Sequence, residues 1–166
     1  MAKQQKVSFG GAVKSLFQRW ADFRGVSTRS EFWFAYLFQV LTNLGIVVVG
    51  ALLVSIFMTL GLFSTATVMM YVGDILYYAW GLFLFLPYLA VTVRRFHDAG
   101  FSAWIYYGPI LWVVLTAVFA IGVAVFSPVA TAIIIWADIL IMFVALAMGF
   151  VIWCLPSKTK DNKYRK

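Results

Sequence analysis

The chain has 166 residues, of which 64% are hydrophobic and only 11% are charged, with 13 Lys and Arg against 6 Asp and Glu. Soluble domains carry about 45–50% apolar and about 25% charged residues, so a soluble protein of this composition could not cover its surface with polar groups. The composition excludes an ordinary soluble domain and predicts a single-domain integral membrane protein.

Residues 1–31 form a basic N-terminal segment ahead of the first long apolar run. Apolar residues recur in it at helical spacing with polar residues between them, which predicts an amphipathic helix: Phe9, Val13, Leu16, Phe17 and Trp20. Two positions fit such a helix, one in the membrane interface and one against the cytoplasmic end of the helix bundle. Thr28 and Glu31 have the spacing of a capping box and predict the start of the first span.

Four apolar stretches follow, each close to or above the about 20 residues that cross the hydrocarbon core. They lie at about 32–62, 75–93, 103–126 and 129–153. Ser127 and Pro128 separate the last two, and Pro128 suits the first position of a helix. Residues 63–74 are expected to form a connection, with Asp74 as the N-cap of the second span. We predict an all-α fold with a four-helix transmembrane domain at residues 32–153.

Every Lys and Arg lies before the first span, between the second and third spans, or after the fourth. The positive-inside rule then places both termini and the Arg94–Arg95 connection in the cytoplasm, an N-in/C-in topology. The basic tail at residues 154–166 is expected to be loose. Basic residues beside apolar runs favour anionic lipid headgroups over nucleic acid as the partner.

Asp138 is the ionisable residue that lies deep inside a predicted span. A charge at the centre of a bilayer costs about 2.5–3.5 kcal/mol on insertion scales, so such residues usually face the bundle interior. One hypothesis is a proton or cation relay. The other is a structural hydrogen bond between helices, to Asn43, Thr42 or Thr116.

The densest group of polar side chains is predicted at the cytoplasmic ends of the first two spans. It comprises Arg24, Arg29, Glu31, Arg94, Arg95, His97 and Asp98. The arginines fit a phosphate or lipid headgroup, His97 and Asp98 fit acid–base chemistry, and the whole group also fits an ion-pair network. No nucleophile is marked out, and one Cys and one His are too few for a zinc site, so no catalytic residue, metal or cofactor is predicted.

Three patches of the sequence are similar to one known family. They contain Phe23-Arg24-Gly25, Arg29 and Glu31-Phe32-Trp33; then Leu86-Pro87, Arg94-Arg95-Phe96-His97-Asp98 and Ser102-Ala103-Trp104; then Cys154-Leu155-Pro156, Asn162 and Tyr164. In these residues the chain resembles the domain-of-unknown-function 805 family of small bacterial inner-membrane proteins. Val26 departs from its pattern, where members commonly have arginine, and Arg165 replaces a glycine. The resemblance implies an inner-membrane location and no known activity.

The leading hypothesis is a non-enzymatic membrane module, expected to form a homo-oligomer, whose basic cytoplasmic face binds anionic lipid or a protein partner. One alternative is a small oligomeric transporter or channel component that uses Asp138. The other is a lipid-modifying membrane enzyme that uses His97 and Asp98. Transporters commonly contain internal repeats and enzymes a nucleophile or metal cluster, and the sequence offers no clear example of either.

Overall fold

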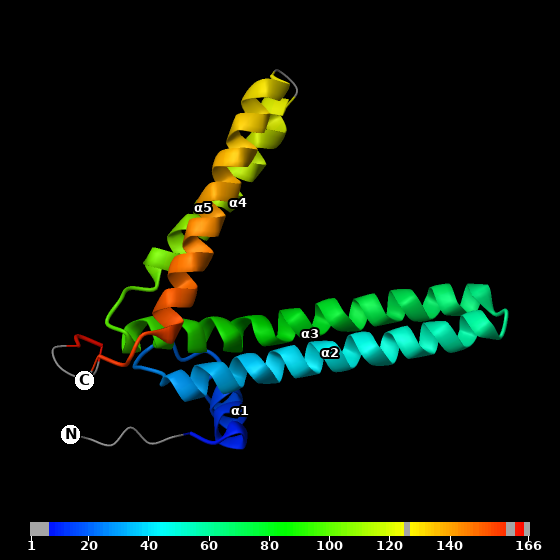
Figure 1. Cartoon of the computed structure of the whole chain (residues 1–166), viewed down its shortest axis with the longest axis horizontal. Coiled ribbons are helices and arrows are strands. Elements are labelled where there is room, and N and C mark those ends of the chain that lie inside the picture. The colour runs from blue at the N-terminus through cyan, green and yellow to red at the C-terminus, as the bar shows by residue number, and fades with distance from the viewer. Residues whose placement is uncertain (1–6, 125–126, 159–161, 165–166) are drawn as a thin grey trace. The chain divides into compact units, whose positions relative to one another are not determined.

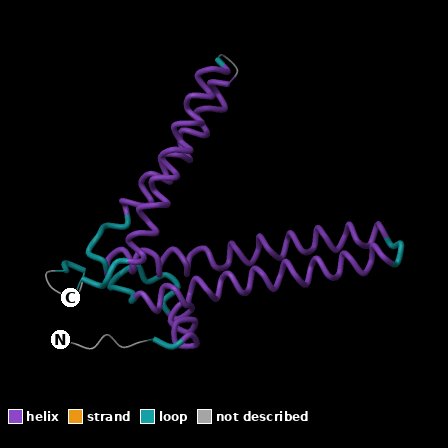
Figure 2. Tube along the Cα trace, in the orientation of Figure 1, coloured by secondary structure: helices purple, strands orange, loops and turns teal. Residues whose placement is uncertain are grey.

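The computed structural model describes residues 7–124, 127–158 and 162–164, and within them all regular structure is helical (Figures 1 and 2). The helices are α1 (Phe9–Gln18), α2 (Arg29–Thr59), α3 (Phe63–Asp98), α4 (Trp104–Ala124) and α5 (Pro128–Cys154). Helices α2 to α5 are each long and apolar enough to cross a membrane. The predicted all-α fold with four transmembrane helices is confirmed, and the chain is a multi-pass membrane protein.

The chain divides into two compact units. The first comprises Met1–Phe23 and Ser30–Thr92, and the second comprises Arg24–Arg29 and Val93–Lys166. The first unit thus holds α1, nearly all of α2 and most of α3, whereas the second holds the end of α3 together with α4 and α5. Residues 24–29 belong to the second unit, with the C-terminal half of the chain. The basic N-terminal segment predicted at residues 1–31 is therefore divided between the two units.

In the first unit, α2 and α3 run side by side as a hairpin (Figure 1), and the indole Nε1 of Trp80 donates a 3.0 Å hydrogen bond to Thr42 Oγ1 across it. The turn between them is short because Gly61 adopts a left-handed conformation with φ of 72°. The amide of Leu62 bonds to the carbonyl of Phe57, and the amide of Gly61 to that of Met58. This pattern is a Schellman turn, which satisfies the last carbonyls of α2.

The prediction of a connection at residues 63–74 is wrong. Helix α3 begins at Phe63, and Asp74 lies inside it rather than at its N-cap. The hydroxyl-rich start of this segment looks like a loop in the sequence, but a hydroxyl can bond to a carbonyl of its own helix. Thr67 does so, since its Oγ1 donates to Phe63 O at 3.0 Å. Because Thr67 is accommodated in the helix and Gly61 makes a tight turn, α3 begins only a few residues after the end of α2.

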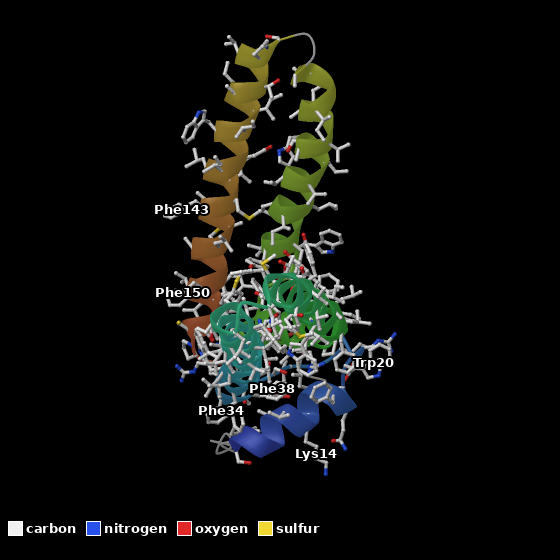
Figure 3. All side chains as sticks on the ribbon, turned by 90° about the vertical axis from the view of Figure 1, so that its right-hand side faces the viewer. Lys14, Trp20, Phe34, Phe38, Phe143 and Phe150 are labelled. Atoms are coloured by element: carbon white, nitrogen blue, oxygen red, sulfur yellow. The ribbon has the colours of Figure 1, made fainter. Side chains whose placement is uncertain are left out.

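The predicted N-terminal amphipathic helix is present as α1. Ser8 caps it by accepting a 3.2 Å hydrogen bond from the amide of Gly11. Ala12 and Leu16 are buried, and Phe17 packs edge-on against Phe38 of α2 with ring centroids 5.9 Å apart. Figure 3 shows Lys14 pointing away from α1 on the side opposite Phe38. Packing against the bundle therefore accounts for the apolar face of α1.

In the second unit, α4 and α5 form a hairpin. Ser127 is the N-cap of α5 and Pro128 its first residue, as the sequence predicts. Near the other end of the hairpin, a Cβ added at Gly149 would lie 2.6 Å from the ring of Tyr106, so glycine permits this close approach. Phe150 points away from α4 (Figure 3), and both Phe143 and Phe150 are exposed.

Candidate functional site

Arg95 ties the end of α3 to the end of α5. Its Nε and one terminal nitrogen donate to Trp153 O at 3.2 and 3.1 Å. The same terminal nitrogen lies 3.4 Å from Ile152 O and also donates to Leu155 O. The last carbonyls of a helix have no partner within it and form the negative end of its dipole. Arg95 therefore caps α5 with both hydrogen bonds and charge.

Asp98 completes this arrangement one turn further along α3. Its Oδ2 accepts a 2.7 Å bond from Nη1 of Arg95, and both side chains are fully buried. The same carboxylate oxygen accepts a bond from the hydroxyl of Ser157, and the backbone carbonyl of Asp98 accepts one from the amide of Lys158 at 2.9 Å. Asp98 is thus both the charge partner of Arg95 and an anchor for the tail.

The C-terminal tail is docked in its described part, so the prediction of a loose tail is wrong there. The side-chain amide of Asn162 donates to His97 O at 2.8 Å and lies 3.3 Å from Asp98 O. Tyr164 stacks on the imidazole of His97 with ring centroids 3.9 Å apart. The physical reason is that the last carbonyls of α3 have no partner within the helix and can accept hydrogen bonds from other segments, and Asn162 adds a donor to two of them.

Burial lowers the pKa of two of the basic groups at the end of α3, His97 and Arg95. This end lies beyond the apolar run, since about 20 residues cross the hydrocarbon core and α3 has 36. Burial lowers the pKa of His97, a hydrogen bond with the backbone of Gly25 opposes this, and the charge of Lys163 lowers the pKa further. Burial likewise lowers the pKa of Arg95, against the attraction of Asp98. His97 is therefore neutral at neutral pH, whereas a guanidinium stays protonated.

The segment Arg24–Arg29 joins the same cluster within the second unit. The amide of Ser27 donates to Arg94 O at 3.1 Å, and Nε of Arg94 donates to Ser27 Oγ at 3.1 Å. Nη1 of Arg29 lies 3.4 Å from the carbonyl oxygen of Cys154. Within the segment, Gly25 adopts a left-handed backbone conformation with φ of 81°. Three segments that are distant in the sequence, around residues 27, 95 and 158, thus meet in one place.

The predicted site residues fall into different environments. Arg94, Arg95 and Asp98 are buried, His97 is half-buried, and Arg24 and Arg29 are exposed. Glu31 lies in the first unit, where it is buried and accepts a 2.6 Å bond from the hydroxyl of Ser15. Two exposed lysines of the tail accompany the exposed arginines. We call these four side chains the basic rim: Arg24, Arg29, Lys158 and Lys163.

Sequence reasoning did not assign a role in the site to four residues that contact its members: Ser27, Ser157, Asn162 and Tyr164. Asn162 and Tyr164 occur in the third patch of the family resemblance, and that signal could have identified them. Ser27 and Ser157 carry no signal, because serine is common in turns and near helix ends.

The geometry favours ion pairing over acid–base chemistry at Asp98. The Asp98 carboxylate already binds Arg95 and Ser157, and the His97 ring is covered by Tyr164. A general base must reach the proton that it abstracts, and the Asp98 carboxylate is engaged elsewhere. Within residues 7–124, 127–158 and 162–164, no group of three or more His, Cys, Asp and Glu could hold a metal ion.

Asp138 forms a separate polar site within the second unit. It is 8% exposed, and the hydroxyl of Thr116 on α4 lies 2.9 Å from both of its carboxyl oxygens. Thr116 is one of the three partners that the sequence suggests. Thr42, another of the three, instead accepts the bond from Trp80. The contact links α4 to α5 inside the hairpin.

Comparison with known proteins gives a match to a family model that covers all the residues of the cluster. A family model described as "Protein of unknown function (DUF805)" matches residues 20–166, a range that includes Ser27, Arg95, Asp98, Asn162 and Tyr164. Neither the curated proteins nor the solved structures contain a match.

Proposed function

The chain belongs to the DUF805 family, and from that premise we propose that it is a bacterial inner-membrane protein that binds anionic lipid headgroups through its basic rim. In this proposal both termini are cytoplasmic, and the protein carries out no catalytic step of its own. The proposal concerns the four exposed cations of the second unit, Arg24, Arg29, Lys158 and Lys163.

One observation carries the proposal, namely the separation of buried from exposed cations. Arg95 is fully buried and its donors are taken by Asp98 and by carbonyls of α5, so its charge serves the fold. The rim cations are exposed on segments that this buried cluster holds in place. A phosphate binds best to cations whose positions are fixed beforehand, because less conformational freedom is lost on binding.

The distribution of charge along the sequence supports the proposed orientation. All 13 Lys and Arg residues lie before α2 or at its first residue, follow the apolar run of α3, or follow α5, and the α2–α3 and α4–α5 turns contain none. The cytoplasmic leaflet carries the anionic surface potential, which attracts each nearby basic residue by about 1 kcal/mol. The same residues that set the topology thus lie where anionic headgroups are found.

The test compares lipid retention by variants of the purified full-length chain in mild detergent. Mixed micelles supply equal amounts of phosphatidylglycerol and phosphatidylcholine, and the lipid that remains bound is measured by native mass spectrometry. Two double variants remove the rim in halves, Arg24→Gln with Arg29→Gln and Lys158→Gln with Lys163→Gln. At about 1 kcal/mol for each cation, either double variant is expected to bind phosphatidylglycerol about tenfold or more weakly.

The matched control removes two cations of the first unit, Lys14→Gln with Arg19→Gln. Arg19 is already paired with Asp22, its Nη2 lying 2.9 Å from Oδ2. This control is expected to retain most of the phosphatidylglycerol preference. If it lost as much as the rim variants, total charge rather than the rim would be responsible, and the proposal would fail.

A further inference from the structure

A groove runs between α4 and α5 at the depth of Asp138. Its volume is about 740 Å³, and its walls are apolar except for two side chains, Asp138 and Thr131. On α4, the groove is lined by three alanines at helical spacing, whose small side chains leave space between the two helices: Ala117, Ala120 and Ala124. Ligand sites in proteins usually measure about 300–1,000 Å³ and combine apolar walls with a few polar groups. The groove has the size and the composition of such a site.

The carboxyl of Asp138 gives the groove its chemical character. Asp138 is 8% exposed and is held by Thr116, so its position is fixed. The stretches 103–126 and 129–153 contain no Lys and no Arg that could act as its counter-charge. In hydrocarbon, an ionised carboxylate is strongly disfavoured unless a counter-charge replaces the hydration that it has lost. A cation that enters from the bilayer would supply the missing charge.

We propose that this groove binds a lipophilic cation, such as an organic ammonium or phosphonium with an apolar body. Its charged centre lies nearest the carboxylate of Asp138, and its apolar groups lie along Ala117, Ala120 and Ala124. A bare metal cation fits less well, because hard cations take about six or more oxygen ligands and the groove offers one carboxyl and one or two hydroxyls. The site is separate from the basic rim and does not depend on the function proposed for it.

The probe is tetraphenylphosphonium, whose charge is independent of pH, and the measurement is equilibrium dialysis with the purified full-length chain in non-ionic detergent. Saturable binding of one cation per chain is expected. Asp138→Asn removes the charge and keeps the shape, so binding should weaken by at least about tenfold. Ala117→Phe fills the groove while Asp138 stays intact, and it should weaken binding to a similar extent. Ala117 is exposed, so the larger side chain fits without changing the core.

The control is Asp74→Asn, which removes an exposed acid from α3, in the other hairpin. It is expected to bind the probe as the wild type does. Ala124→Leu replaces Ala117→Phe if the latter does not fold, as judged by helical content and thermal unfolding. Binding that does not saturate, or equal binding by wild type and Asp138→Asn, would overturn the proposal. The proposal would also be overturned if the wild type did not bind the cation and Asp138→Asn changed the oligomeric state. That result would mean that a second copy of the chain fills the groove.

Discussion

Tyr164 lies flat on His97, with ring centroids 3.9 Å apart and an angle of 10° between the ring planes. The two residues come from the end of the tail and the end of α3. Asn162, two residues before Tyr164, bonds to the carbonyl of His97 at 2.8 Å. Beyond the anchors at Ser157 and Lys158, the tail is therefore held by the ring stacking of Tyr164 and by the bond from Asn162 to a backbone carbonyl, and mutation can separate these two contacts.

Replacement of Tyr164 by alanine should release the tail without unfolding the helices. Aromatic pairs contribute about 0.5–1.5 kcal/mol beyond the area that they bury, so the docked state should become about two- to tenfold less populated. Tryptic cleavage after the exposed Lys158 and Lys163 in the native protein measures this. Tyr164→Phe keeps the ring and should cleave at the wild-type rate. Equal rates for Tyr164→Ala and Tyr164→Phe would show that stacking does not hold the tail.

Tail docking should also depend on pH through His97. Burial lowers the pKa of His97 below its ordinary value of 6.5, so below that pH the undocked state, with His97 nearer its ordinary pKa, binds more protons than the docked one. The stability of docking is therefore full above pH 6.5 and falls as the pH drops below it. Lys163 adds to this effect, because its charge repels a protonated imidazole.

The measurement is the rate of tryptic cleavage of the tail between pH 7.5 and pH 5.5. His97→Gln is the control, because it lacks the imidazole and its cleavage rate should change with pH only as the activity of the protease changes. The ratio of wild-type to control cleavage should rise as the pH falls. A ratio that stays flat across this range would show that His97 does not control docking.

The Arg95–Asp98 pair should be the most sensitive part of the cluster. Asp98→Ala leaves a buried guanidinium without its charge partner, which costs about 3–5 kcal/mol. Arg95→Lys should also be severe, since an ammonium cannot reach the carbonyls of Ile152 and Leu155 and the Asp98 carboxylate together. Thermal unfolding in detergent should show a large loss for both variants.

Arg29→Lys is the control for that comparison, because Arg29 is exposed and its contact with Cys154 O is 3.4 Å long. It should change the free energy of unfolding by only about 0–1 kcal/mol. Wild-type stability in Arg95→Lys would contradict the structural role of Arg95.

The sequence predicts the four spans because a span needs only a long apolar run, and such a run is visible without any knowledge of contacts. It predicts the start of α5 because Ser127 and Pro128 act locally. It does not predict the docked tail, because the partners of Asn162 are carbonyls whose availability depends on where α3 ends. It also misses the start of α3, because the hydroxyl of Thr67 has the same local signature in a loop and in a helix.

Asp138 should tolerate loss of charge better than loss of polarity. Asp138→Asn keeps a hydrogen-bonding group beside Thr116 and should leave stability in detergent nearly unchanged. Asp138→Leu should lose about 0.6–1.7 kcal/mol, the range for polar contacts between membrane helices. Thr116→Val removes the same contact from the other side and should lose a similar amount. If Asp138→Asn folded normally and abolished a proton- or cation-dependent flux, the relay hypothesis would replace the structural one.

The orientation of the basic rim is the premise of the proposed function, and Cys154 reports it directly. Cys154 is the chain's single cysteine, its side chain is exposed, and its carbonyl lies beside the rim residue Arg29. The measurement is labelling by a membrane-impermeant maleimide in intact spheroplasts and after the membrane is opened. A cytoplasmic rim predicts labelling only after opening. Labelling of intact spheroplasts from outside would contradict the account.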